Sequence, residues 1–257
     1  MADWNSVQYL KFAKERTQPA IDLANKIPLE DPQMAIDIGC GPGNSTRVLA
    51  DRFPHARVMG VDNSPNMIGK AKKMQTDLEF RLFDASKDFD TMDQTFDIVF
   101  SNACIQWVPD HPVLLRNMMG LLREGGVLAV QVPMNFQEPV HRILEELSTS
   151  EKWKSHFSHV RTFYTLEQRE YFDLLAEISS DFSIWETIYC HRMPSHESII
   201  EWYKSTGLRP YLAALSERDA TEFERDVYHE VVKAYPKQKN GEIIFRFPRF
   251  FFTAVKA

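Results

Sequence analysis

The chain lacks the features that mark membrane-bound and disulfide-stabilised proteins. No apolar run approaches the ~18 residues that can cross a bilayer, and the first residues form neither the basic nor the apolar segment of a secretion signal. Only three cysteines occur among 257 residues, Cys40, Cys104 and Cys190, and their odd number and wide spacing do not suit a disulfide framework. We therefore expect a cytoplasmic protein with free thiols and no membrane partner.

An excess of basic charge and clusters of metal ligands are missing as well. The formal net charge of −6 argues against a nucleic-acid partner, which would require a basic surface. His156 and His159 form one HxxH pair, but no cysteine or further histidine stands at ligand spacing, so we expect no metal site. With 44% hydrophobic residues, the chain has the composition of a globular protein and is long enough for one large domain.

Strand-like and helix-like segments alternate through the first half of the chain. Short apolar runs are separated by helical stretches of ~10 residues, which is the pattern of βαβ units around a parallel sheet. Ser64, just before Pro65, is a candidate N-cap for one of these helices. The predicted strands cover 34–40, 56–62, 78–84, 96–102 and 125–133, and the predicted helices cover 45–53, 65–74 and 112–122.

The pattern changes in the second half. Two more strands are predicted at 183–191 and 242–255, and a helical stretch longer than an ordinary connection separates them. Ser195 and Ser216 are candidate N-caps for two of its helices, and we interpret the stretch as a helical cap over the carboxyl edge of the sheet. The predicted single domain covers 1–257, with N-terminal helices at 4–26 and the cap insertion at about 196–235. Residues 137–180 are predicted to be helical except for a polar middle at 148–158, which is not assigned.

The most informative motif is a glycine-rich turn between the first strand and the first helix of this pattern. It begins at Asp37 and carries Gly39, Gly41 and Gly43, which let the backbone turn tightly and let a ligand approach closely. The next strand ends at Asp62, about 20 residues after the turn. There a carboxylate can accept hydrogen bonds from both hydroxyls of a ribose, so the two features together predict an adenosine cofactor rather than a turn alone.

The spacing of the glycines separates two adenosine cofactors. A dinucleotide site needs a third glycine in G-x-G-x-x-G, and counting from Gly39 that position is Asn44. The G-x-G-x-G spacing found here is similar to that of class I methyltransferases, which bind S-adenosylmethionine and have no pyrophosphate to hold. This comparison favours S-adenosylmethionine over a nicotinamide cofactor.

Polar residues at the following strand ends support the same cofactor. Asp84, followed by Ala85, can accept a hydrogen bond from an adenine amino group, and Asn102 ends the next strand beyond it. Open α/β sheets bind their ligands at such strand ends. Taken singly, each of these polar residues is explained equally well as a cap of its loop. The predicted cofactor residues are Asp37, Gly39, Cys40, Gly41, Asn44, Asp62, Asn63, Met67, Asp84, Ala85 and Asn102.

The chain resembles the trans-aconitate methyltransferases along nearly its whole length. The glycine-rich turn is common to many methyltransferases, whereas the Gln-Trp-x-Pro-Asp-His and Thr-Gly-Leu-Arg-Pro stretches are more specific. Phe89 and Phe136 depart from the pattern, because we expect tryptophan there in the family. The resemblance rests on Asp3–Asn5, Tyr9–Arg16, Asp37–Thr46, Asn102–His111, Met193–His196, Thr206–Pro210 and Phe247–Arg249.

The resemblance implies a Rossmann-like α/β fold whose sheet is mostly parallel with an antiparallel last strand. It also implies an enzyme that makes the monomethyl ester of trans-aconitate. A tricarboxylate partner calls for arginines, whose planar guanidinium matches a carboxylate. Arg209 is a candidate ligand, or else a surface arginine. Arg249 and Arg246 interrupt an apolar strand and must find either an acidic side chain or an anionic ligand. Arg16 is a candidate for the substrate or for the carboxylate of the cofactor.

Trp107 is a candidate for positioning the acceptor carboxylate. Its indole N–H can only donate, and in the related methyltransferases of juvenile hormone acid the similar tryptophan is thought to play this part; the alternative is a packing role. Tyr9 and His111 are weaker candidates. A carboxylate nucleophile is already ionised near neutral pH, so no general base is required.

Three other functions remain open from the sequence. The first is a methyltransferase for another small carboxylic acid or small-molecule acceptor, for which Arg209 would matter little. The second is a module that binds S-adenosylmethionine without turnover. The third is a nicotinamide-dependent oxidoreductase, which Asn44 in place of a glycine disfavours.

Overall fold

The described part of the chain contains one mixed sheet with helices along it. The computed structural model describes residues 13–157, 163–204 and 206–257, with 13–16 described by their backbone alone. In these ranges seven strands form a sheet in the order β3-β2-β1-β4-β5-β7-β6. The strands are β1 (Met34–Ile38), β2 (Arg57–Asp62), β3 (Glu79–Leu82), β4 (Phe96–Asn102), β5 (Leu122–Pro133), β6 (Phe182–Met193) and β7 (Ile243–Val255).

The pairing of the strands is mixed, as expected. Strands β1 to β5 pair in parallel, and β7 pairs antiparallel with β5, so the prediction of a mostly parallel sheet with an antiparallel last strand is confirmed. The central strand β4 is buried at six consecutive residues. Such continuous burial is typical of strands whose two faces are both covered by helices.

The strand order places the helices on both faces. From β1 the chain moves outward to β2 and β3 in one direction and later to β4 and β5 in the other. Because parallel crossovers are right-handed, α3 (Asn44–Arg52) and α4 (Pro65–Met74) cover one face, and α5 (His111–Gly120) covers the opposite face. The carboxyl ends of β1 and β4 therefore meet where the strand order reverses, which is the usual ligand-binding position of open α/β sheets.

Side-chain caps fix where several helices begin. The hydroxyl of Ser64 accepts a hydrogen bond from the amide of Met67 at 3.2 Å, and Pro65 follows as the first residue of α4, as predicted. Ser216 caps α10 (Glu217–Ala234) in the same way through the amide of Asp219. The predicted N-caps Ser64 and Ser216 are thus confirmed.

Several predicted boundaries differ from those of the structure, and for two of them the local reason is visible. β3 ends at Leu82 rather than at Asp84, because the carboxylate of Asp84 accepts from the amide of Ser86 and closes a turn. β5 begins at Leu122 rather than at Gly125, since the register with β4 shifts at its start and the strand continues past the irregularity. The helix predicted at 112–122 is α5, which ends at Gly120.

Contacts within the chain divide it into two compact units. Unit 1 comprises Met1–Pro133, Phe163–Thr187 and Arg249–Ala257, and unit 2 comprises Met134–Thr162 and Ile188–Pro248. Unit 1 holds the first five strands together with α2 (Ala13–Ala24) and α7 (Gln168–Ile178), and β6 and β7 run through both units. No helix within the described ranges is both long and apolar enough to cross a membrane.

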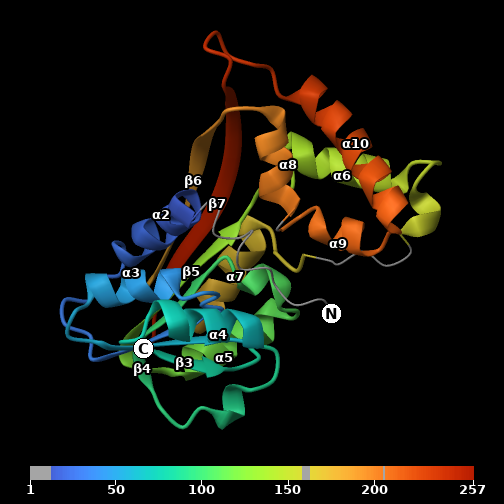
Figure 1. Cartoon of the computed structure of the whole chain (residues 1–257). Helices are drawn as coiled ribbons and strands as arrows, with labels where there is room; N and C mark the ends of the chain where they lie inside the picture. The colour runs from blue at the N-terminus through green and yellow to red at the C-terminus, as the bar shows by residue number, and fades with distance from the viewer. Residues whose placement is uncertain (1–12, 158–162, 205) are drawn as a thin grey trace. The chain divides into compact units, whose positions relative to one another are not determined.

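Unit 2 is built around α10. This helix contacts α6 (Pro139–Thr149), α8 (His196–Lys204) and α9 (Arg209–Ala213), and it buries Phe223, Val227 and Val231, which are spaced four residues apart on one face. The helices predicted at about 196–235 are α8, α9 and α10, which appear in orange to red in Figure 1.

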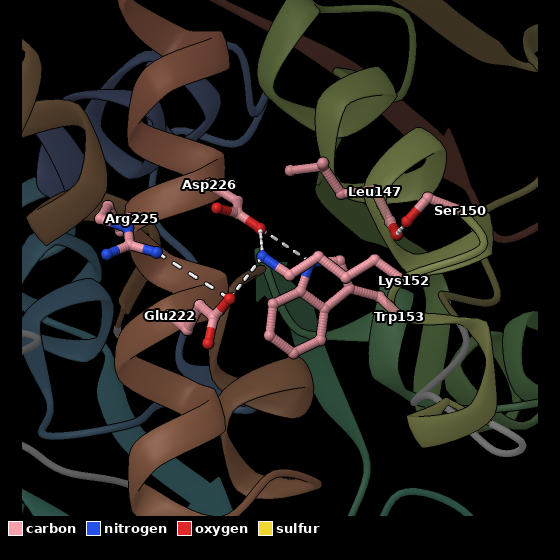
Figure 2. A network of polar contacts seen from close by, with 7 residues as sticks. All are labelled: Leu147, Ser150, Lys152, Trp153, Glu222, Arg225 and Asp226. Atoms are coloured by element: carbon pink, nitrogen blue, oxygen red, sulfur yellow. Dashed lines mark hydrogen bonds and ion pairs between the residues drawn. The ribbon is translucent and has the colours of Figure 1, made fainter.

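A polar network joins α10 to the segment after α6. The Lys152 ammonium lies 2.6 Å from carboxylate oxygens of both Glu222 and Asp226. The buried indole of Trp153 donates to the same oxygen of Asp226 at 2.9 Å (Figure 2). Because the indole N–H has a partner, Trp153 can be buried without leaving a donor unsatisfied.

Candidate active site

The glycine-rich turn leads from β1 into α3. Gly39, Gly41 and Gly43 have φ angles of 79°, 54° and 91°, in the left-handed region that other residues enter at a cost of roughly 1–2 kcal/mol. The amides of Gly39 and Cys40 donate to the carbonyl oxygen of Val61 at 2.7 and 3.0 Å. The turn is therefore tied to the end of β2 by the backbone itself.

The first two glycines answer different needs. A Cβ added at Gly39 would lie 2.1 Å from Sγ of Cys104, so this glycine makes room for a side chain of the protein. A Cβ added at Gly41 would meet nothing within 4 Å in the described part of the chain. Gly41 thus leaves its side of the turn open, which is what a closely approaching ligand requires.

Asp37 is the buried acid of the turn. Its Oδ2 accepts hydrogen bonds from the hydroxyls of Ser45 and Thr46, at 2.6 and 2.8 Å, and the residue is fully buried. Burial raises the pKa of Asp37 to about 6, and the two hydroxyl hydrogen bonds limit that rise. Asp37 therefore anchors the start of α3 to β1 at an electrostatic cost.

Asp62 occupies the end of β2, as predicted. Its Oδ2 accepts from the amide of Gly41 at 2.9 Å, and its Oδ1 accepts from the amide of Ser64 at 2.9 Å. The carboxylate is half-buried and holds the turn and the start of α4 at fixed positions. Of the two neighbouring cofactor candidates, Asn63 is exposed and Met67 is buried in α4.

Buried acceptor atoms beside the turn test the expected cofactor. Oδ1 of Asp37, Oδ1 of Asn44 and Oδ1 of Asn102 are all buried and have no donor among the described residues. S-adenosylmethionine carries donors of the required kind, namely an ammonium, two ribose hydroxyls and an adenine amino group. A dinucleotide also has ribose hydroxyls and an adenine amino group, so these atoms fit an adenosine cofactor in general. The G-x-G-x-G spacing of the turn is the feature that favours S-adenosylmethionine.

The thiol of Cys40 has no reactive character. Burial, followed by the nearby carboxylates of Asp37 and Asp62, raises the pKa of Cys40 well above that of an ordinary thiol. The residue therefore contributes packing and a backbone amide to the turn, and its side chain stays protonated.

The third acidic candidate lies in a turn beyond β3. The carboxylate of Asp84 accepts from the amide and hydroxyl of Ser86 at 3.0 and 2.7 Å and lies 3.4 Å from the Lys87 ammonium. Partial burial raises the pKa of Asp84, but these contacts outweigh it and leave the pKa below its usual value. Ala85 is half-buried beside it. Nearby, Phe89 packs edge-on against Phe83 with ring centroids 5.3 Å apart.

The end of β4 is a strained turn. Ala103 follows Asn102 and has a φ of 54°, which is unusual for a residue with a Cβ. Its amide donates to the carbonyl oxygen of Gln131, and its own carbonyl accepts from Nε2 of Gln106 at 2.7 Å. Strain of this kind persists where the surroundings fix it, often at functional sites. The turn leads into a short helix that ends at Trp107.

Trp107 lies in unit 1 and is half-buried. Its ring is tilted against that of Phe163, with centroids 4.7 Å apart. His111 is buried behind this short helix. One ring nitrogen lies 2.8 Å from the carbonyl oxygen of Ile105 and must donate to it, so the other nitrogen accepts from the hydroxyl of Tyr171 at 2.8 Å. Burial lowers the pKa of His111, and the residue supports the turn from within the core.

Arg249 is buried at the carboxyl end of β5. It is 4% exposed, pairs with Pro133 across the sheet, and donates from Nη1 to Oε1 of Gln131 at 3.0 Å. Sequence reasoning missed Gln131. A polar residue inside the buried run Val127–Val132 was the available signal, because such residues are buried only with a specific partner.

The other predicted substrate residues fall elsewhere. Arg209 is the first residue of α9 in unit 2 and is half-buried. Arg246 is exposed and lies 3.7 Å from the carboxylate of Glu138, so for this arginine the acidic side chain of the protein is the partner found. Tyr9 and the side chain of Arg16 lie outside the described residues.

Comparisons with known proteins agree with this geometry at the level of the class. Residues 36–130 match the family model described as a methyltransferase domain. The YcgJ protein of Bacillus subtilis has a TM-score of 0.60 at 14% identity, covering 93% of this chain and 98% of that one. Phosphoethanolamine N-methyltransferase 2 of Haemonchus contortus, solved with S-adenosyl-L-methionine, has a TM-score of 0.53 at 19% identity, covering 95% of this chain and 53% of that one. The fold is therefore that of the class I methyltransferases.

Sequence relatives narrow the class to one family. The chain is 42% identical over 262 residues to a trans-aconitate 2-methyltransferase of Methylobacterium radiotolerans, covering 100% of both. It is 41% identical over 254 residues to a trans-aconitate 2-methyltransferase of Escherichia coli O7:K1, covering 99% of this chain and 98% of the relative. The protein belongs to the trans-aconitate 2-methyltransferase family.

Proposed function

We propose that the protein transfers the methyl group of S-adenosylmethionine to one carboxylate of trans-aconitate, giving the monomethyl ester and S-adenosylhomocysteine. The observation that carries this proposal is the 41–42% identity to trans-aconitate 2-methyltransferases along at least 99% of the chain. The buried acceptor oxygens beside an open glycine turn supply independent support for the methyl donor. Three free cysteines are compatible with a reducing, cytoplasmic setting.

The chemistry asks for alignment rather than proton transfer. Bound S-adenosylmethionine supplies an electrophilic methyl group on a sulfonium. An ionised carboxylate oxygen of the acid forms the new C–O bond as the S–C bond breaks and its electron pair remains on sulfur. No proton moves, which agrees with the structural, neutral state of His111. Alignment of two bound reactants can lower such a barrier by roughly 7–11 kcal/mol.

The residues of unit 1 divide this work. Gly39, Cys40 and Gly41 form the turn that we propose the donor contacts, and Asp62, whose carboxylate accepts from the amide of Gly41, is the proposed acceptor for the ribose hydroxyls. The other proposed donor contacts are Asp37, Asn44, Asn63, Met67, Asp84, Ala85 and Asn102. Trp107, half-buried in the short helix after β4, is the proposed indole donor to the acceptor carboxylate.

Carboxylates that do not react need cations. Arg209 and Arg249 are the proposed partners, with Arg16 and Tyr9 as further candidates. Guanidinium groups suit this task because they stay charged and match both oxygens of a carboxylate. A tight grip on the reacting carboxylate would instead reduce its nucleophilicity, so that group is expected to meet the neutral indole of Trp107.

A transfer assay with labelled methyl donor tests the proposal. Purified protein would be incubated with trans-aconitate, cis-aconitate, citrate, isocitrate or a long-chain acid, and label in extractable ester would be counted. We expect transfer to trans-aconitate at least tenfold above the other acids. Transfer to the long-chain acid alone would refute the tricarboxylate acceptor, and donor binding without any transfer would point to a non-enzymatic module.

Arg209 gives the assay a matched pair of variants. Arg209→Ala should raise KM for trans-aconitate tenfold or more with little change in the Kd for S-adenosylmethionine. Arg218→Ala removes an exposed arginine of the same unit and should leave both constants unchanged. Equal behaviour of the two variants would remove Arg209 from the substrate site.

A further inference from the structure

We infer that Gln131 forms, together with Arg249, a buried subsite for a carboxylate group at the carboxyl end of β5. The inference rests on the proposed function and adds to it a residue that recognises an anion through a neutral amide. The group bound is a carboxylate of the acid or the methionine carboxylate of the methyl donor. These two sources share the same chemistry and are separated by the experiment below.

The orientation of the Gln131 amide is fixed by its neighbour. Arg249 can only donate hydrogen bonds, so the atom 3.0 Å from its Nη1 must be the amide oxygen. The amide nitrogen therefore points away from this contact. Nε2 of Gln131 is buried and has no acceptor in the ranges that the structure describes. Its two N–H bonds present donors to a position without an acceptor.

The burial of Gln131 makes this arrangement informative. The side chain is 0% exposed and sits in a strand whose neighbours are valines and alanine. A buried amide nitrogen without a partner lowers stability, whereas a side chain serving only to support Arg249 would need just its oxygen. A ligand that accepts hydrogen bonds would satisfy the buried N–H donors of Gln131.

The sheet register places this donor beside the proposed methyl-donor site. Gln131 on β5 pairs directly with Asn102 on β4, so their side chains emerge on the same face of the sheet. Arg249 shares that face, because it lies two residues from Phe251, the partner of Gln131 on β7. One face thus carries the buried acceptor of Asn102, the buried donors of Gln131 and a guanidinium.

A carboxylate is the ligand chemistry that this set favours. Two amide N–H bonds and a neighbouring cation complement two oxygens with one negative charge. Asn102 Oδ1 can receive a donor next to that carboxylate. A neutral or cationic group at the same place would leave the Gln131 donors unsatisfied.

Gln131→Glu is the variant that separates the two roles of the side chain. Glutamate keeps the size and the oxygen that accepts from Arg249, and it replaces the N–H donors with a second anionic oxygen. Supporting Arg249 would therefore be preserved, whereas binding a carboxylate would be opposed. Titration calorimetry would give the Kd for S-adenosylmethionine and, with S-adenosylhomocysteine present, for trans-aconitate. Steady-state assays would give KM.

We expect Gln131→Glu to weaken one of the two ligands at least tenfold while its circular dichroism and Tm stay at the wild-type level. Weaker binding of trans-aconitate with an unchanged Kd for S-adenosylmethionine would assign the subsite to the acid. The difference in Kd between variant and wild type should then be smaller for a dicarboxylate analogue. Weaker S-adenosylmethionine would assign it to the methionine carboxylate. Kd values within twofold of wild type for both ligands would overturn the subsite.

Two further variants guard the test. Gln75→Glu is the matched control, because Oε1 of Gln75 also accepts from an arginine, Arg47, at 2.9 Å. This control variant should change neither Kd. If Gln131→Glu does not fold, Gln131→Met removes the donors without adding charge and is held to the same tenfold criterion. Wild-type protein that binds S-adenosylmethionine but does not methylate trans-aconitate would refute the proposed acceptor, while the S-adenosylmethionine titration would still decide the subsite.

Discussion

At the scale of single residues, Asp37 shows how a binding site lowers the stability of the protein that contains it. Its carboxylate is fully buried, receives two hydroxyl hydrogen bonds, and leaves Oδ1 without a donor in the described part of the chain. The raised pKa of about 6 means that the ionised form is disfavoured in the folded state. A ligand that donates to this oxygen would recover part of the lost free energy.

Asp37→Asn should therefore change how stability depends on pH. A folded-state pKa near 6, above the ordinary value of 3.8, makes Asp37 increasingly unfavourable as pH rises from about 4 to about 6. Above that range the penalty is on the order of 3 kcal/mol. Urea unfolding of the ligand-free protein would be measured from pH 4 to pH 8. The unfolding free energy of the variant should rise relative to that of wild type up to about pH 6, and the difference should be constant above it. A difference that is the same at pH 4 and pH 7 would contradict the assigned pKa.

Gly39 and Gly41 should respond differently to the same substitution. Gly39→Ala combines left-handed backbone strain with a clash against Cys104 and should cost about 2–5 kcal/mol of unfolding free energy. Gly41→Ala adds strain alone and should cost about 1–2 kcal/mol, yet it places a methyl group where the ligand approaches. Chemical denaturation and titration with S-adenosylmethionine would check both. A Gly41→Ala protein with wild-type affinity would show that the open side of the turn is not used.

At the scale of secondary-structure elements, polar side chains decide how α10 is held to the segment after α6. Asp226 serves two donors at once, the exposed ammonium of Lys152 and the buried indole of Trp153 (Figure 2). The ammonium contact is solvent-exposed and worth little. The indole contact satisfies a donor that burial would otherwise leave unpaired.

Two alanine variants should separate these contributions. Asp226→Ala leaves the Trp153 indole without its acceptor and should cost about 1–3 kcal/mol. Lys152→Ala removes the exposed ion pairs with Glu222 and Asp226 and the contact of the ammonium with the Trp153 ring, and it should cost about 1 kcal/mol or less. Urea unfolding monitored by tryptophan fluorescence, at low and high salt, would measure both. Lys152→Ala proving the more damaging variant would show that charge, rather than the buried donor, holds α10.

At the scale of the whole molecule, each unit contains residues that are proposed to bind a small molecule. The methyl-donor residues lie in unit 1, whereas Arg209 lies in unit 2. A ligand that binds only the folded state stabilises the segments that hold it. Slower amide hydrogen exchange can therefore identify the segments that bind each ligand. The two ligands can also be added one at a time.

Hydrogen exchange should follow the order of addition. S-adenosylmethionine alone should slow exchange in residues 37–46, 60–67 and 100–107. Adding trans-aconitate to the complex with S-adenosylhomocysteine should further slow exchange in residues 206–213, and this second change should be absent in Arg209→Ala. Protection of 206–213 by S-adenosylmethionine alone would assign Arg209 to the methyl donor instead.

The sequence alone was sufficient for the sheet and for the glycine turn. Strand and helix periodicity predicted the parallel core, and Ser64 and Ser216 were predicted as N-caps, because these signals are local and act within a few residues. Boundaries at β3 and β5 were missed, since a turn at Asp84 and a register shift beside β4 depend on neighbouring groups.

Only the tertiary structure decided what the individual side chains do. The sequence predicted that Gly39 lies in the turn. The side chain that leaves no room for a Cβ there belongs to Cys104, which is 65 residues further along the chain. His111 and Gln131 are likewise defined by partners on distant segments, Tyr171 and Arg249. Pairing across strands brings such groups together, and burial then determines which donor or acceptor remains for a ligand. Neither pairing nor burial of a given atom is encoded in the local sequence.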